Sequence, residues 1–151
     1  MRQKKECVQR EQLFAGWKFK LQEEQGWRDV KVPHDWSTEY PICEEEPTCG
    51  SGGYVHAGVG LYQRGFQAEP GKDEHIWFYF EGIYMSSTVY INGEKAGSHF
   101  YGYTPFEIDA TPYLREGNNT LLIIVDNSEQ PNSRWYSGSG VLHLIRIKAF
   151  C

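Results

Sequence analysis

Short runs of β-branched and aromatic residues, separated by Gly, Pro, Asn and Asp, recur along the whole 151-residue chain. No long stretch carries apolar side chains at the three- and four-residue spacing of an amphipathic helix. Short β-prone runs divided by turn residues are typical of antiparallel strands. The sequence therefore predicts an all-β protein, and the fairly even spacing of the turns favours a β-sandwich.

Three segments carry the clearest strand signals. Ile76–Phe80 is apolar on both alternating faces, which predicts a central strand. Thr88–Ile91 and Lys95–His99 flank Asn92-Gly93, a dipeptide that tolerates the positive φ angles of a tight hairpin. Thr120–Asp126 is predicted to form another strand.

Three further expectations concern the turns and tryptophans around these strands. Residues 116–119 (EGNN) read as a turn before the Thr120–Asp126 strand, and residues 141–150 (VLHLIRIKAF) read as one last strand. Trp17, Trp27, Trp36 and Trp77 are expected in the core. Trp135 is expected to be the most exposed tryptophan.

The charge balance argues against two classes of partner. The chain has 15 Lys and Arg against 20 Asp and Glu, a net charge of −5, so no broad basic field exists to attract nucleic acid. The basic start MRQKK is followed by polar residues and not by an apolar run, so neither a signal peptide nor a membrane span is indicated. We expect a cytoplasmic protein, and a secreted or periplasmic location stays open if a signal has been removed.

The cysteines and histidines do not suggest a metal site or a bound cofactor. The four cysteines, at positions 7, 43, 49 and 151, form no paired CxxC motif, and the histidines show no HxH or HExxH spacing. Cys43 and Cys49 bracket a short loop, and the sequence leaves open whether they form a disulfide or two free thiols. His34 either lines a pocket or belongs to a turn that seats Trp36 in the core, and we favour the structural role.

Residues 125–140 (VDNSEQPNSRWYSGSG) combine amide, hydroxyl, guanidinium and aromatic groups in one turn-rich segment. Such a mixture suits sugar, because pyranose C–H faces pack on aromatic rings and hydroxyls accept fork-like hydrogen bonds. The alternative is an ordinary loop with Trp135 folded back into the core.

Five motifs in order carry a resemblance to a known family. They are VPHDW (Val32–Trp36), GGYVHAGVGLYQRGF (Gly52–Phe66), FEGIYMSSTVYINGEKAG (Phe80–Gly97), YGYTPFEIDATPYL (Tyr101–Leu114) and the segment at 125–140. Together they resemble the N-terminal sugar-binding domain of β-galactosidases of glycoside hydrolase family 2. The resemblance implies a jelly-roll sandwich over residues 13–151 after an N-terminal extension at 1–12. In that family an immunoglobulin-like domain and a catalytic (β/α)8 barrel follow, and the barrel holds the catalytic glutamates.

The resemblance also implies which residues would contact the sugar. In the family, the loops equivalent to residues 50–58 and 132–140 reach the rim of the galactoside pocket. The candidate substrate-binding residues are therefore Arg134, Asn132, Ser133, Trp135, Tyr54 and His56. Several members carry an Asp where this chain has Arg134, so the role of that Asp does not transfer directly. Arg134 alternatively pairs with Asp126 or Glu129 and only rigidifies the loop.

The leading hypothesis is a non-catalytic domain that completes the sugar pocket of a retaining β-galactosidase-like hydrolase, with β-glucuronide and β-mannoside hydrolases as sister possibilities. Its partners would be carbohydrate and the remaining domains of the enzyme, and no catalytic pair is expected within this chain. A free-standing carbohydrate-binding module and a purely structural interdomain module are the alternatives. The sequence leaves self-association into a homo-oligomer open.

Arg134→Ala distinguishes between two roles of this residue, contact with sugar and rigidification of the loop. In an enzyme that contains this domain, the substitution should lower kcat/KM by about ten- to a thousand-fold, or 1.4 to 4 kcal/mol, if a hydroxyl bond strengthens in the transition state. The melting temperature should stay nearly unchanged. Lost stability with intact kcat/KM would instead identify the arginine as scaffold.

Overall fold

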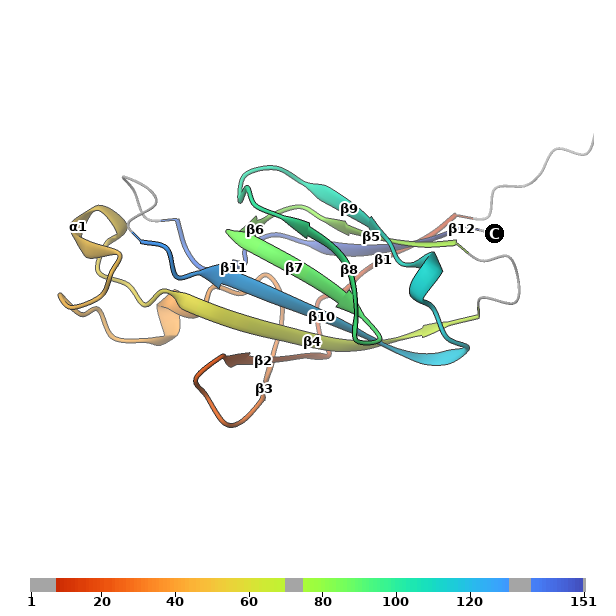
Figure 1. The fold of residues 1–151 in the computed structure, drawn as a ribbon, viewed down its shortest axis with the longest axis horizontal. Coiled ribbons are helices and arrows are strands. Elements are labelled where there is room, and N and C mark those ends of the chain that lie inside the picture. Colours follow the sequence, from red (N-terminus) through yellow and green to blue (C-terminus); the bar gives the residue numbers. More distant parts are fainter. Residues whose placement is uncertain (1–7, 70–74, 131–136, 151) are drawn as a thin grey trace, which may run out of the picture.

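The two longest strands, β4 (Gly58–Ala68) and β10 (Gly117–Asn127), pair antiparallel along their full lengths (Figure 1). They occupy the middle of a six-stranded antiparallel sheet with the order β3-β2-β4-β10-β7-β8. The other members are β2 (Trp17–Leu21), β3 (Arg28–Val30), β7 (Ser86–Ile91) and β8 (Glu94–His99). This computed structural model describes residues 8–69, 75–130 and 137–150.

A four-stranded antiparallel sheet, ordered β1-β12-β5-β9, forms the second layer. Its strands are β1 (Val8–Gln12), β5 (His75–Phe80), β9 (Phe106–Asp109) and β12 (Ile145–Phe150). Residues 8–12, which the sequence analysis placed in an N-terminal extension, thus form a strand that pairs with β12. The two sheets enclose one core, and this arrangement confirms the all-β, jelly-roll sandwich predicted from the sequence.

The remaining elements are short. β6 (Ile83–Tyr84) pairs with β11 (Gly140–Val141), and the helical segments are η1 (Trp36–Glu39), α1 (Cys49–Gly52) and η3 (Thr111–Tyr113). In the part of the chain that the structure describes, no helix has the length and apolar character needed to cross a membrane.

Every second side chain of the strands in both sheets points into the core between them. In β10, Leu121, Ile123 and Val125 share the inner face and are at most 1% exposed, while in β5 Phe78 and Phe80 are fully buried. Each fully buried side chain of this size stabilises the fold by about 1.5–3 kcal/mol. The predicted central position of residues 76–80 is confirmed, because β5 lies between β12 and β9.

The predicted hairpin at Asn92-Gly93 is also confirmed. β7 and β8 pair across it, and the φ angles of Asn92 and Gly93 are 51° and 81°. These positive values are the ones that a two-residue type I′ turn requires.

Three predictions about individual segments were wrong. Residues 117–119 belong to β10 and not to a turn, because they pair with residues 66–68 of β4. The buried Asn119 side chain also bonds to the backbone of Arg115 and Gly117. The expected strand at 141–150 is broken after Val141, and β12 begins at Ile145. Trp27 is 39% exposed, because it lies beyond the end of β2, where Lys20 Nζ rests over its ring.

Gly60 on β4 allows the Trp36 ring to lie directly against the sheet. A Cβ atom at this position would be 2.5 Å from Cζ3 of Trp36 and 2.9 Å from Cε2 of Phe19, and both rings are fully buried. Neither ring can retreat in a close-packed core. The inner face of β4 therefore requires glycine at residue 60.

Gly60→Ala should destabilise the protein by about 1–3 kcal/mol, because the added methyl group overpacks the core. Gly65→Ala is a matched control on the same strand, where the added Cβ would meet only the Asn119 carbonyl oxygen at 3.8 Å. The control should leave stability unchanged or slightly raised, since alanine costs less backbone entropy than glycine. Thermal unfolding followed by circular dichroism measures both, and equal melting temperatures would contradict the packing argument.

Candidate functional site

The register of β4 and β10 brings two distant loops to one end of the sandwich. Asn127 at the end of β10 lies opposite Gly58 at the start of β4. The loop that enters β4 and the loop that leaves β10 therefore emerge side by side, at the end that also carries α1 (Figure 1). These are the two loops that the sequence analysis assigned to sugar contact.

Backbone and side-chain hydrogen bonds shape the loop that enters β4. The Cys43 N–H donates to the Tyr54 carbonyl at 3.0 Å, and the Thr48 hydroxyl donates to the Val55 carbonyl at 2.9 Å. Tyr54 has a φ of 54°, and its residue is 37% exposed. The loop is thus folded back on itself with the Tyr54 ring presented to solvent. Cys43 and Cys49 are free thiols, which answers the question that the sequence left open.

His56 is the most chemically informative residue of this loop. Its Nδ1 lies 2.7 Å from Glu46 Oε1, and its ring packs on Tyr40 with 4.6 Å between the ring centres. Because a carboxylate only accepts, His56 Nδ1 carries a proton and donates to Glu46. Nε2 is buried and has no hydrogen-bond partner among the described residues, and the nearest carboxylate oxygen, of Glu23, is 3.6 Å away.

A cavity of about 170 Å³ opens beside His56. It is lined by side chains from three separate segments, including Glu23 after β2, Glu46 and His56 before β4, and Ser128 after β10. The cavity therefore joins the two predicted loops beside the His56 ring. Most ligand pockets are larger, about 300–1,000 Å³, so this volume suits one wall of a site and not a complete pocket.

The second loop is held at its base. Asn127 Nδ2 donates to the Ser139 hydroxyl at 2.7 Å and to the Gly138 carbonyl at 3.3 Å. The Ser139 N–H in turn donates to Asp35 Oδ1 at 2.9 Å. The loop thus leaves and re-enters the fold at adjacent, fixed points.

A partly buried polar network of His34, Tyr62, Glu39 and Arg28 lies beside this base. His34 Nδ1 lies 2.7 Å from the Tyr62 hydroxyl, and His34 Nε2 lies 2.7 Å from Glu39 Oε1. Arg28 also bonds to Glu39. Burial raises the pKa of Tyr62 well above its usual value, so the phenol keeps its proton and can donate to His34.

The backbone of the same segment pairs with residues 139–141. The His34 N–H donates to the Val141 carbonyl at 2.7 Å, and the Trp36 N–H donates to the Ser139 carbonyl at 3.0 Å. Trp36 itself is fully buried. These contacts support the favoured structural role of His34, because its backbone pairs with Val141 and its ring bonds to Tyr62 and Glu39.

The structure describes two of the six candidate substrate-binding residues. Tyr54 and His56 lie on one loop, with Tyr54 exposed and His56 at the cavity. Asn132, Ser133, Arg134 and Trp135 lie outside the described residues. Sequence reasoning missed Glu23, Glu46 and Ser128 as lining residues, since only the strand register brings them together. Within the described ranges, no group of three or more His, Cys, Asp or Glu side chains is arranged to hold a metal ion.

Comparison with known proteins agrees with this geometry. Residues 8–142 match the family model described as "Glycosyl hydrolases family 2, sugar binding domain". β-Galactosidase BoGH2A from Bacteroides ovatus is 41% identical, over 88% of this chain and 17% of its own length. The chain therefore spans about a sixth of that relative.

Solved structures show the same likeness. A β-glycosidase from Bacteroides vulgatus superposes with a TM-score of 0.86 and 33% identity, covering 93% of this chain and 20% of its own. A β-glucuronidase from Bacteroides uniformis gives a TM-score of 0.76 and 28% identity, covering 94% of this chain and 18% of its own.

The Glu39 carboxylate makes the bracing network sensitive to acid. Burial raises its pKa, but hydrogen bonds from His34 and Arg28 outweigh that effect and hold the pKa below the ordinary value of 4.5. A lowered folded-state pKa stabilises the protein above the unfolded-state value, and that contribution disappears as the pH falls through the folded value. Glu39→Gln should therefore melt a few degrees below the parent at neutral pH.

The difference in melting temperature should shrink below about pH 4.5 and vanish once Glu39 is protonated in the parent. Thermal unfolding across this pH range provides the measurement. Glu107→Gln, which removes a carboxylate paired with Lys148 on the other sheet, is the control. A melting-temperature difference that stays constant into acid would show that Glu39 acts through packing and not through charge.

Proposed function

We propose that this chain, which belongs to the sugar-binding domain family of the family 2 glycosyl hydrolases, binds carbohydrate where β4 begins and β10 ends. It acts there as a non-catalytic wall of a sugar pocket. The remaining domains of a glycoside hydrolase supply the other walls and the catalytic carboxylates.

The observation that carries this proposal is the cavity in which Glu46 and His56 of the loop before β4 meet Ser128 after β10. Imidazole, carboxylate and hydroxyl groups at one cavity can exchange hydrogen bonds with sugar hydroxyls. The exposed Tyr54 ring on the same loop offers an apolar face for pyranose C–H groups. Asn132, Ser133, Arg134 and Trp135 would complete the wall from the second loop.

The charges around the cavity favour a neutral sugar. Glu23 and Glu46 both line it, and two carboxylates would repel the carboxylate of a glucuronide. We therefore propose a β-galactoside or a similar neutral β-glycoside as the ligand. A β-glucuronide is the second candidate, which the relative from Bacteroides uniformis supports and the Arg134 guanidinium could bind.

Two acidic residues, Asp35 and Glu81, hold parts of the scaffold together. Asp35 Oδ1 accepts hydrogen bonds from the Ser37 and Ser139 N–H groups, and Glu81 pairs with Arg146 at 3.0 Å. Neither is arranged as a free acid or nucleophile across a glycosidic bond. Asp35 and Glu81 are therefore scaffold residues of this fold.

His56→Ala tests the proposal in the 151-residue chain. Lactose should shift the backbone amide signals of residues around His56, Gly58 and Ser128 in a ¹⁵N-labelled sample, with a dissociation constant in the millimolar range because only one wall is present. The substitution should weaken this binding by about tenfold, the equivalent of one hydrogen bond of 1.4 kcal/mol.

His75→Ala is the control, since His75 is exposed at the start of β5 and lines none of this cavity. A melting curve for each variant separates a lost contact from a disrupted loop. Unchanged lactose affinity in His56→Ala, or no shifts at this end in the parent, would refute the proposed site.

A further inference from the structure

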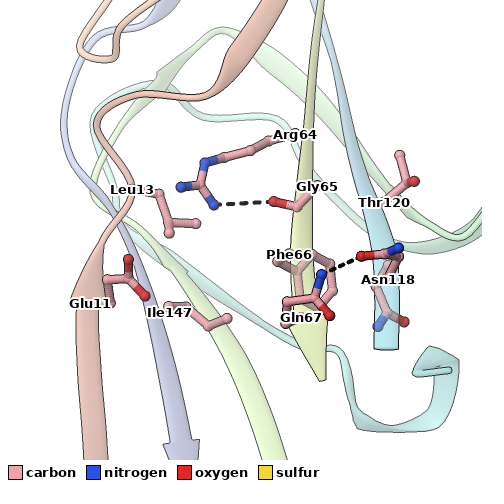
Figure 2. A pocket seen from close by; sticks show the side chains of 10 residues that line it. Glu11, Leu13, Arg64, Gly65, Phe66, Gln67, Asn118, Thr120 and Ile147 are labelled. Carbon is pink, nitrogen blue, oxygen red and sulfur yellow. Dashed lines mark hydrogen bonds between the residues drawn. The ribbon is translucent and has the colours of Figure 1, made fainter. Parts of the chain in front are cut away.

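A second and larger cavity, of about 500 Å³, lies between the two sheets at the far end of β4 (Figure 2). We call it the sheet-gap cavity. Arg64–Gln67 of β4 and Asn118–Thr120 of β10 form one side, and Glu11, Leu13 and Ile147 of the other sheet and its connection form the other. Gly58 and Phe66 are eight residues apart on β4, so the two cavities lie about 25 Å apart.

The register of β2 explains why this gap exists. β2 pairs with β4 only from Gly60 to Gln63, because β2 begins at Trp17 and the strand before it, β1, belongs to the other sheet. Among the described residues, Arg64–Ala68 of β4 therefore pair with β10 on one side only. The unpaired half of β4 faces β1 across the cavity.

The floor of the sheet-gap cavity is apolar and its rim is polar. Leu13 and Phe66 are 2% and 9% exposed, and they place hydrocarbon at the base. Glu11, Gln67 and Asn118 are exposed at the rim, where Gln67 Nε2 donates to Asn118 Oδ1. Apolar surface with a few convergent polar groups is the usual composition of a small-molecule site.

Arg64 supplies a fixed donor to this cavity. Its Nε donates to the Ala15 carbonyl at 2.8 Å and its Nη1 to the Gly65 carbonyl at 3.2 Å, so the guanidinium is held in one orientation. A guanidinium has five N–H donors. Within the described ranges Nη2 makes no hydrogen bond, which leaves its two donors for a ligand.

The chemistry of the lining indicates the class of ligand. One carboxylate, Glu11, and one guanidinium, Arg64, give the rim no net charge, so it favours neither an anion nor a cation. Amide and guanidinium groups bind neighbouring hydroxyls in pairs, and the apolar floor suits the C–H face of a pyranose. We propose that the sheet-gap cavity is a second carbohydrate-binding site, which takes a neutral oligosaccharide independently of the site at His56.

An extended peptide is the other ligand that an unpaired strand edge can take. The observations favour sugar, because Arg64 Nη1 already occupies the Gly65 carbonyl that an added strand would need. The exposed side chains of Glu11 and Gln67 also flank the edge, and charged or polar side chains oppose strand addition.

Lactose titration of the ¹⁵N-labelled chain tests this proposal, because the two sites carry different amides. The signals of Gly65, Gln67, Asn118 and Thr120 should shift and saturate in the millimolar range. Gln67→Ala should weaken this set of shifts several-fold, and it should keep the fold because Gln67 is exposed. Arg64→Lys should do the same, since lysine keeps the charge and loses the planar fork.

Two control variants make the test specific. Arg146→Ala removes a half-exposed arginine of β12 that pairs with Glu81 and lines neither cavity, and it should leave the shifts unchanged. His56→Ala should also leave this set unchanged while weakening the shifts at its own end. We therefore expect each variant of a cavity residue to weaken the lactose-induced shifts at its own cavity and to leave those at the other cavity unchanged.

Three results would overturn the proposal. The first is lactose shifts confined to the His56 end, which would leave the proposed function standing and remove the second site. The second is shifts at the sheet-gap cavity that persist unaltered in both Gln67→Ala and Arg64→Lys. The third is a short Val- and Thr-rich peptide shifting these amides where lactose does not, which would identify a strand-addition edge.

Discussion

The full-length pairing of β4 with β10 is the constraint on which the rest of the structure depends. Its register places Gly58 opposite Asn127 at one end and Ala68 opposite Gly117 at the other. The first pair brings two loops distant in sequence to one cavity, and the second lies at the end where β4 has no β2 partner and faces the sheet-gap cavity. A shift of one residue would also turn Tyr62 and Ile123 out of the core, so the same hydrophobic pattern fixes both the fold and the position of the sites.

Much of the fold could be predicted because its signals are local. The two-residue alternation of Ile76–Phe80 and the positive φ angles tolerated by Asn92-Gly93 are properties of a few neighbouring residues. Asn119 was misread, because its turn-forming side chain is buried and bonds to Arg115, a contact that propensity alone does not reveal. The break after Val141 was missed for a similar reason, since Val141 pairs with Ile83 in a separate two-stranded sheet.

The candidate site was predictable only in part. The resemblance to a family pointed to Tyr54 and His56, but no local pattern links His56 to Glu23, which lies across the cavity from a different loop. The sequence indicated that the segment around His34 places Trp36 in the core. The bonds of the His34 side chain to Tyr62 and Glu39 could not be predicted, because they depend on tertiary packing. Residues that act through long-range contacts are the ones that sequence reasoning leaves undetermined.

The pairing of β1 with β12 bears on how the chain acquires its fold. Val8 lies opposite Phe150, so the four-stranded sheet joins the first described residues to the last. During synthesis the six-stranded sheet can assemble once β10 has emerged, whereas β1 must wait for a strand made more than a hundred residues later. Until then the inner faces of β5 and β9 lack half of their sheet, and an incomplete sheet of this kind is exposed to aggregation. The order in which the strands emerge thus makes the last strand, β12, the one that closes the core.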